Sequence, residues 1–280
     1  MAARFWVNGT GEWNSTNTAN WSSASGSTAA GASVPTSADT VTLDAASGGG
    51  TATVNSTIIV TSITMGAFTG TLDFSANDNN VTTQTFSNSG TGARTLNMGD
   101  GTWTITTPSA TPWDQGTTTN LTFNSNASTL SIAASGTPSA QRVVSLGASL
   151  TYNALNINDP VLASSIVRRP IIFGSAGNTL TTFSITNAYW IEITASTTTT
   201  ITNGFSYSGS QGSPILIKSQ SANSAYTLSV GGAVSLSWAA IMNCTKAGAG
   251  SIIATNSFDL GGNNGVTITS PGGGGGVISG

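Results

Sequence analysis

The clearest structural pattern of the sequence is found in Tyr226-Thr227-Leu228-Ser229-Val230-Gly231-Gly232-Ala233-Val234-Ser235-Leu236-Ser237-Trp238. Apolar residues alternate with Thr or Ser on both sides of a Gly-Gly pair. Successive side chains of a strand point to opposite faces, so this pattern places one side chain inside and the next outside. Thr suits the outward positions of a strand because it is β-branched. The stretch therefore predicts two short strands joined by a tight corner.

The same alternation recurs along most of the chain. It is found at Val41/Leu43, Leu72/Phe74, Trp103/Ile105, Leu121/Phe123, Leu130/Ile132, Leu155/Ile157, Phe183/Ile185 and Ile191/Ile193. Segments rich in Gly and Asn separate the runs, at 48–50, 77–80, 99–101, 174–178 and 261–265. Gly and Asn tolerate the positive φ that a cornering chain requires. Helical periodicity is nearly absent, so we expect an all-β fold.

Short strands between such turns suit a sandwich, a barrel or a β-solenoid. A solenoid stacks one coil on the next, roughly every 20–30 residues. Val41, Leu72 and Trp103 are evenly spaced along the chain, but later spacings are irregular. We predict a parallel β-helix (β-solenoid), and a β-sandwich or jelly roll is the alternative.

Three regions are expected from the changes in composition. Residues 1–40 contain three of the seven Trp residues, Trp6, Trp13 and Trp21, and predict an N-terminal aromatic cap over the first coil. Residues 41–265 carry the alternating runs and form the β-solenoid body. Residues 266–280 form a Gly-rich C-terminal tail, which is either flexible or packed closely against a partner chain.

The charge content excludes several classes of partner. Only 6% of the residues are charged, against about 25% in an average soluble domain. The net charge is −3, and the seven Lys and Arg residues are spread along the chain. We therefore expect no nucleic-acid binding and no membrane-surface patch. No stretch approaches the roughly 18 apolar residues of a membrane span, so no membrane insertion is expected.

The chain contains no His and a single Cys, Cys244. Ser-His-Asp and Cys-His catalysis and most transition-metal sites are therefore excluded, and Cys244 is expected to be a small buried hydrophobe. A phosphate-binding Gly loop with its Lys is also missing. Asp78, Asp100 and Asp259 lie near Gly or Asn and could bind Ca²⁺, but their spacing matches no known calcium loop. We expect no cofactor and no metal.

Paired carboxylates remain as possible catalytic groups, because they can hydrolyse a glycosidic bond. Asp100 and Asp114 bracket Trp103 and Trp113, and an aromatic ring beside an acid suits a sugar site. Asp100 is more simply explained as a turn residue in Gly-Asp-Gly. Glu192 is expected to point outward, since Ile191 and Ile193 would take the inward face.

Two interruptions of the pattern supply candidate binding residues. Trp113 lies in Thr111–Gly116, outside any alternating run, and an exposed Trp there would be a contact residue. The alternative is a Trp folded over the end of the sheet. Arg168 and Arg169 precede a strand at 171–173 and could pair with the carboxylates of a partner. The alternative for this pair is a solvated corner.

Two segments support a resemblance to a known group of proteins. The first is Arg4-Phe5-Trp6-Val7-Asn8-Gly9-Thr10-Gly11-Glu12-Trp13, continued by 19–21 and 31–41, and the second runs from Leu236-Ser237-Trp238 through 254–265. Together they resemble Thr/Gly-rich β-proteins of tailed bacteriophages and prophages, described as virion or tail-associated proteins. The resemblance implies a β-helical or β-sandwich virion component and supplies no catalytic set. The chain departs from it after Gly265.

These observations favour a non-enzymatic structural protein on the surface of a bacteriophage virion, outside the cell. It would be a tail fibre or tip component for host attachment, or a capsid decoration. The expected partners are other copies of the chain (a trimer, by analogy with phage appendages), other virion proteins and a host surface glycan. The alternatives are a tailspike-type polysaccharide depolymerase and a bacterial surface adhesin. The absence of an apolar run at 1–6, where a signal peptide would begin, argues against the adhesin.

Overall fold

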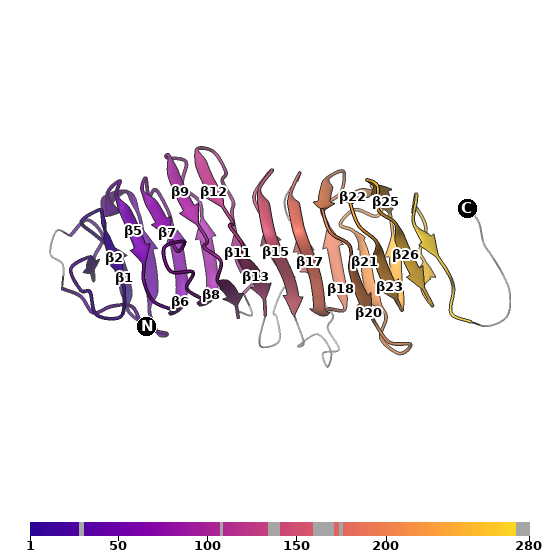
Figure 1. The fold of residues 1–280 in the computed structure, drawn as a ribbon, viewed down its shortest axis with the longest axis horizontal. Helices are drawn as coiled ribbons and strands as arrows, with labels where there is room; N and C mark the ends of the chain where they lie inside the picture. Colours follow the sequence, from indigo (N-terminus) through magenta and orange to yellow (C-terminus); the bar gives the residue numbers. More distant parts are fainter. Residues whose placement is uncertain (28–30, 107–108, 134–140, 159–170, 174–175, 273–280) are drawn as a thin grey trace.

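The chain winds as an elongated β-solenoid of parallel strands (Figure 1). The computed structural model describes residues 1–27, 31–106, 109–133, 141–158, 171–173 and 176–272. These ranges contain a single helical element, the 3₁₀ turn η1 (Ala45–Ser47), and hence no helix that could span a bilayer. The predicted parallel β-helix is confirmed, and the alternative β-sandwich is wrong.

Strands from successive coils stack in three rows, one on each face of the solenoid. On the first face the order is β1 (Ala3–Trp6), β4 (Thr40–Leu43), the second half of β6 (Ile58–Met65), the second half of β8 (Val81–Asn88), β11 (Trp113–Asp114), β14 (Arg142–Ser145), β16 (Ile171–Phe173), β18 (Trp190–Ile193), β21 (Ile215–Ser219), β24 (Ala239–Met242) and β27 (Phe258–Asp259). Every step in this row is parallel, so each coil extends the same sheet.

The second face begins with β2 (Gly11–Trp13), β5 (Thr51–Val54), β7 (Thr71–Asp73), β9 (Arg94–Asn97) and β12 (Leu121–Asn124). It continues with the starts of β15 (Thr151–Asn158) and β17 (Thr179–Asn187), then β19 (Thr198–Ile201), β22 (Tyr226–Val230) and β25 (Cys244–Ala247). The rings of Phe123 and Tyr152, 4.9 Å apart, connect these two parts of the row.

The third face carries the first halves of β6 and β8, then β10 (Thr102–Ile105), β13 (Thr129–Ile132) and the later parts of β15 and β17. A separate parallel sheet follows on this face, formed by β20 (Phe205–Ser208), β23 (Val234–Ser237), β26 (Ile252–Thr255) and β28 (Thr267–Ile268). The hydrogen-bonded ladder is therefore interrupted between β17 and β20.

The coils differ in length, which hides the repeat in the sequence. On the first face, Ile241 pairs with Asp259 through a short coil, whereas the coil that joins Asp114 to its register partner Ser145 is much longer. The even spacing of Val41, Leu72 and Trp103 has a different origin, because these residues lie on β4, β7 and β10, one on each face. That interval spans one coil plus one face, so it is no sequence repeat.

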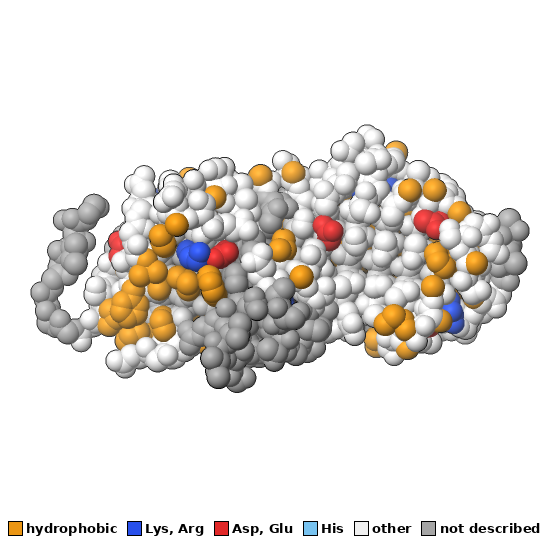
Figure 2. Space-filling view, turned by 180° about the vertical axis from the view of Figure 1, so that it is seen from behind, with side chains coloured by type: hydrophobic (Ala, Val, Ile, Leu, Met, Phe, Trp, Pro, Cys, Tyr) orange, Lys and Arg blue, Asp and Glu red, His pale blue; other side chains and the backbone are white. Residues whose placement is uncertain are grey.

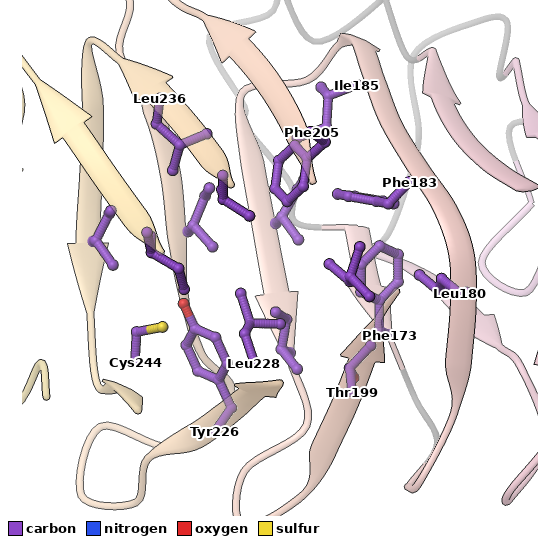
Figure 3. Close-up of a pocket in the computed structure, with 17 residues that line it drawn as sticks. Phe173, Leu180, Phe183, Ile185, Thr199, Phe205, Tyr226, Leu228, Leu236 and Cys244 are labelled. Carbon is purple, nitrogen blue, oxygen red and sulfur yellow. The ribbon is translucent and has the colours of Figure 1, made fainter. Parts of the chain in front are cut away.

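The interior changes character along the rod. At the N-terminal end Trp21 packs edge-on against Trp6 and Trp13, with ring centroids 5.2 and 5.0 Å apart. The centre is filled by a stack in which Trp103 and Trp113 lie 5.7 Å apart. Toward the C-terminal end aliphatic side chains, together with Phe173, Phe183, Phe205 and Tyr226, line the lumen and leave an apolar void of about 30 Å³ (Figure 3).

The two ends of the rod are built differently. At the N-terminal end β3 (Trp21–Ser22) pairs antiparallel with β1, so it covers the first edge of the sheet with a strand of opposite direction. At the other end β28 pairs in parallel with β26, and Phe258 and Leu260 are exposed. Strand β28 lies within the segment 266–280 that the sequence assigned to a tail, and residues 273–280 lie outside the described part.

Candidate interaction surfaces

Trp113 lies in the core, so the prediction that it is an exposed contact residue is wrong. It belongs to β11 and is fully buried. Its ring stacks on Phe86 at 4.5 Å, and its indole Nε1 donates a hydrogen bond of 3.1 Å to the hydroxyl of Tyr152. Strand β11 has only two residues, too few for the alternation to be recognised in the sequence.

The other residues singled out from the sequence are widely distributed. Arg168 and Arg169 lie outside the described residues. Asp100 is an exposed turn residue whose carboxylate accepts a hydrogen bond from the backbone N–H of Ala127, at 2.9 Å, and so connects two successive coils. Asp114 follows Trp113 on β11 and faces outward. The carboxylate of Asp100 thus holds a turn, whereas that of Asp114 lies on the outer surface of the first face.

Glu192 points outward, as its position between Ile191 and Ile193 predicts. It is nevertheless only 8% exposed. On the next coil its register partner is Lys218, whose Nζ lies 2.7 Å from Oε1 of Glu192. The same ammonium lies 5.4 Å from the ring centroid of Trp190, within the range of a cation–π contact. A basic and an acidic side chain thus neutralise each other on this face.

An apolar row runs beside this ion pair on the outer surface of the first face. The register joins Trp190 to Leu216, Leu216 to Ala240 and Ala240 to Phe258, one residue from each of four successive coils. The first three are half-buried, and Phe258 is 41% exposed. We call these four residues the apolar row. Figure 2 shows hydrophobic side chains gathered toward the C-terminal end of the molecule, beside basic and acidic atoms.

Another outward row, in the N-terminal half of the same face, is polar. There the register joins Thr42, Thr64, Ser87, Asp114 and Ser145, all of which point outward. Hydroxyl groups can bond to water or to neighbouring backbone, whereas the side chains of the apolar row cannot. The first face therefore carries a polar outward row in its N-terminal half and an apolar outward row in its C-terminal half.

The apolar row was missed in the sequence, although a signal for it exists. Two of its members, Leu216 and Ala240, stand inside uninterrupted apolar runs, Ile215-Leu216-Ile217 and Ala239-Ala240-Ile241-Met242. A continuous apolar run marks a strand that is buried on both faces. Alternation marks only strands with one apolar face, so these runs do not display it.

A buried cation was also missed. Arg94 is 3% exposed, and its guanidinium donates hydrogen bonds to Oδ1 of Asn88 (2.6 Å) and to the carbonyl oxygens of Gly92, Thr117 and Thr119. Burial lowers the pKa of Arg94 from its ordinary value. The Arg94 side chain therefore joins the corners of two coils by hydrogen bonds.

The described ranges contain no group of three or more His, Cys, Asp or Glu side chains that could hold a metal ion. Of the acids considered for Ca²⁺, Asp78 accepts a hydrogen bond from the backbone N–H of Asp100 (2.9 Å). The carboxylate of Asp259 bonds to the N–H of Gly261 and to the amide of Asn263. These bonds hold turns at coil corners.

Comparison with known proteins returns no relative: no family model, no curated protein and no solved structure matches this chain.

Proposed function

We propose that the chain is a non-enzymatic structural rod on the surface of a bacteriophage virion, assembled side by side with other copies of itself. The observation that carries the assembly is the apolar row, an outward strip of Trp190, Leu216, Ala240 and Phe258 on an otherwise hydroxyl-rich solenoid. Other exposed hydrophobic residues, such as Ile59 and Ile253, stand outside the row, whereas the row is contiguous, and contiguous apolar surface marks a protein interface. The virion location is supported by the resemblance of 4–41 and 236–265 to phage virion proteins.

A second copy suits this strip for geometric reasons. Successive members of the apolar row come from hydrogen-bonded neighbouring strands, which lie about 4.8 Å apart. An identical copy in parallel orientation carries the same spacing, so its coils meet those of the first copy one by one. Lys218 and Glu192 beside the strip neutralise each other, so two copies do not repel. The expected product is a parallel homo-oligomer, with a trimer as the first candidate.

Gold-labelled antibodies against the purified chain test the location on particles of the phage that encodes it. Label on the tail tip or fibres would make the rod a host-attachment component, and label over the head would make it a capsid decoration. Label at either place supports the proposal. Particles that carry no label, although the same antibodies detect the unassembled chain in the lysate, would refute it.

A further inference from the structure

The third face contains a seam between β17 and β20. The last backbone hydrogen bond across it runs from the N–H of Asn203 to the carbonyl of Thr181, at 3.0 Å. Beyond that point β17 is paired with β15 and β20 with β23, but β17 and β20 are not paired with each other. Both strands therefore present an edge of backbone N–H and C=O groups to the seam, and these groups require polar partners.

A surface groove of about 440 Å³ follows this seam. Its sides are formed by Ile185 and Thr186 of β17, Ser206–Ser208 of β20, Ser235–Ser237 of β23 and Thr255 of β26. Volumes of roughly 300–1,000 Å³ are usual for sites that bind small ligands. The groove is therefore large enough for about two sugar rings.

The groove is lined by neutral groups, and two of its hydroxyls are free to bind a ligand. The hydroxyls of Ser208 and Ser237 bond to each other at 2.6 Å, and that of Thr186 bonds to the amide oxygen of Asn156 at 3.1 Å. Ser206 and Ser235, adjacent in register, make no side-chain hydrogen bond within the described part of the chain. Each of these two hydroxyls can both donate and accept a hydrogen bond.

Apolar surface lies beside these hydroxyls. Ile185, Leu236 and the ring of Tyr207 contribute carbon atoms to the groove. The hydroxyl of Tyr207 is engaged, because it donates a hydrogen bond of 3.1 Å to the carbonyl of Ala188, so the ring is held in place. The combination of C–H surface and free hydroxyls matches a sugar, which has apolar ring faces and a rim of hydroxyls.

Other ligand classes fit less well. An anion would find no Lys or Arg among the lining residues, and a cation would find no carboxylate. An extended peptide would need about 4.8 Å on each side to pair with both strands. Cα atoms of β17 and β20 approach within 8 Å, whereas two strands that flank a third lie about 9.6 Å apart, so β17 and β20 are too close for a strand between them.

We propose that the groove between β17 and β20 is a binding site for a neutral oligosaccharide, with the free hydroxyls of Ser206 and Ser235 as its hydrogen-bonding groups. The site goes beyond the proposed structural function and does not depend on the location of the rod on a particle. No bond is made or broken at the site, so it provides recognition without turnover.

Isothermal titration calorimetry of the full chain with maltohexaose, cellohexaose, mannohexaose and N-acetylchitohexaose tests this assignment, with an α-1,4-galacturonic acid hexamer as the anionic comparison. At least one neutral hexasaccharide is expected to bind, and the Ser206→Ala/Ser235→Ala double variant should weaken that binding by about tenfold or more. Ser229→Ala is the matched control, because Ser229 points outward on β22, away from the groove. Circular dichroism establishes that both variants keep the fold.

Three results would overturn the assignment: no binding of any neutral hexasaccharide, equal binding by the double variant, or tighter binding of the galacturonic acid hexamer. The outcome is separable from that of the proposed function. A virion-located rod that binds no sugar refutes only the groove, and a sugar-binding chain found on no particle refutes only the location.

Discussion

The two halves of the solenoid share one backbone pattern and differ in what they place on each side of it. In the N-terminal half Trp and Phe rings pack against one another in the lumen, and one outward row on the first face is Thr42, Thr64 and Ser87. In the C-terminal half the lumen is lined by aliphatic side chains together with four aromatic ones and contains a void, and one outward row is apolar. A parallel β-coil fixes only the alternation of inward and outward positions. The residue types at these positions decide whether a stretch of the rod mainly stabilises the fold or binds a partner.

The largest expected effect separates the two interiors. Trp103 contacts the rings of Phe74, Phe86 and Trp113, so Trp103→Ala opens a large cavity in a packed stack. We expect a loss of about 4 kcal/mol in the free energy of unfolding, measured by guanidinium denaturation. Leu228→Ala, beside the void, should cost about 2 kcal/mol. Equal losses at the two positions would show that the interiors are equally well packed.

Removing the buried guanidinium of Arg94 in the N-terminal half should have the next largest effect on stability. Arg94→Met keeps much of the side-chain volume but leaves the carbonyls of Gly92, Thr117 and Thr119 without their donor. We expect a loss of about 3 kcal/mol, because buried acceptors then lack partners. Arg94→Lys keeps the positive charge but lacks the planar set of guanidinium donors. It should therefore recover only part of the lost unfolding free energy. A fully stable Arg94→Met variant would contradict the structural role of this cation.

Alkaline pH should weaken the C-terminal half in particular. Burial raises the pKa of Cys244 to about 11 and that of Tyr226 well above its usual value. The native state keeps a proton on Cys244 that the unfolded chain releases near pH 8.5. This contribution to stability is fully present below that pH and is lost as the pH rises toward 11. It amounts to roughly 3 kcal/mol for Cys244.

Unfolding curves measured across this pH range test the expectation. Cys244→Ala should reduce the loss of unfolding free energy at alkaline pH, because no thiol then titrates in either state. In the native wild type at pH 8 the thiol should also react slowly with Ellman's reagent, and unfolding should release it. A fast reaction in the native state would show that the C-terminal lumen is open to solvent.

The smallest expected effect concerns the ion pair beside the apolar row. A double-mutant cycle with Glu192→Gln and Lys218→Met should give a coupling energy of about 1 kcal/mol, since the pair is mostly but not completely buried. The stability of the single and double variants, measured by urea denaturation, supplies the four values required. A coupling energy near zero would mean that the pair only neutralises the surface of this half.

The sequence predicted the fold and most of the inward positions, because strands with one apolar face leave a period of two. Its failures have physical reasons. Coils of unequal length conceal the stacking, since corners absorb insertions while the strands stay in register. Trp113 stands in a strand too short to show alternation. Arg94 is polar yet points inward, because carbonyls from corners distant in the sequence surround it. The groove depends on a missing strand pairing, which leaves no trace in composition.

Sedimentation velocity tests the central claim, that the apolar row makes the C-terminal half the assembling half. The wild type should sediment as an oligomer of the 28.0 kDa chain at micromolar concentration. Leu216→Asp, which places a charge in the apolar row, should sediment as a folded monomer. Thr64→Asp, at an outward position on the same face of the N-terminal half, should leave the oligomer intact. A monomeric wild type, or an oligomer that survives Leu216→Asp, would contradict the account.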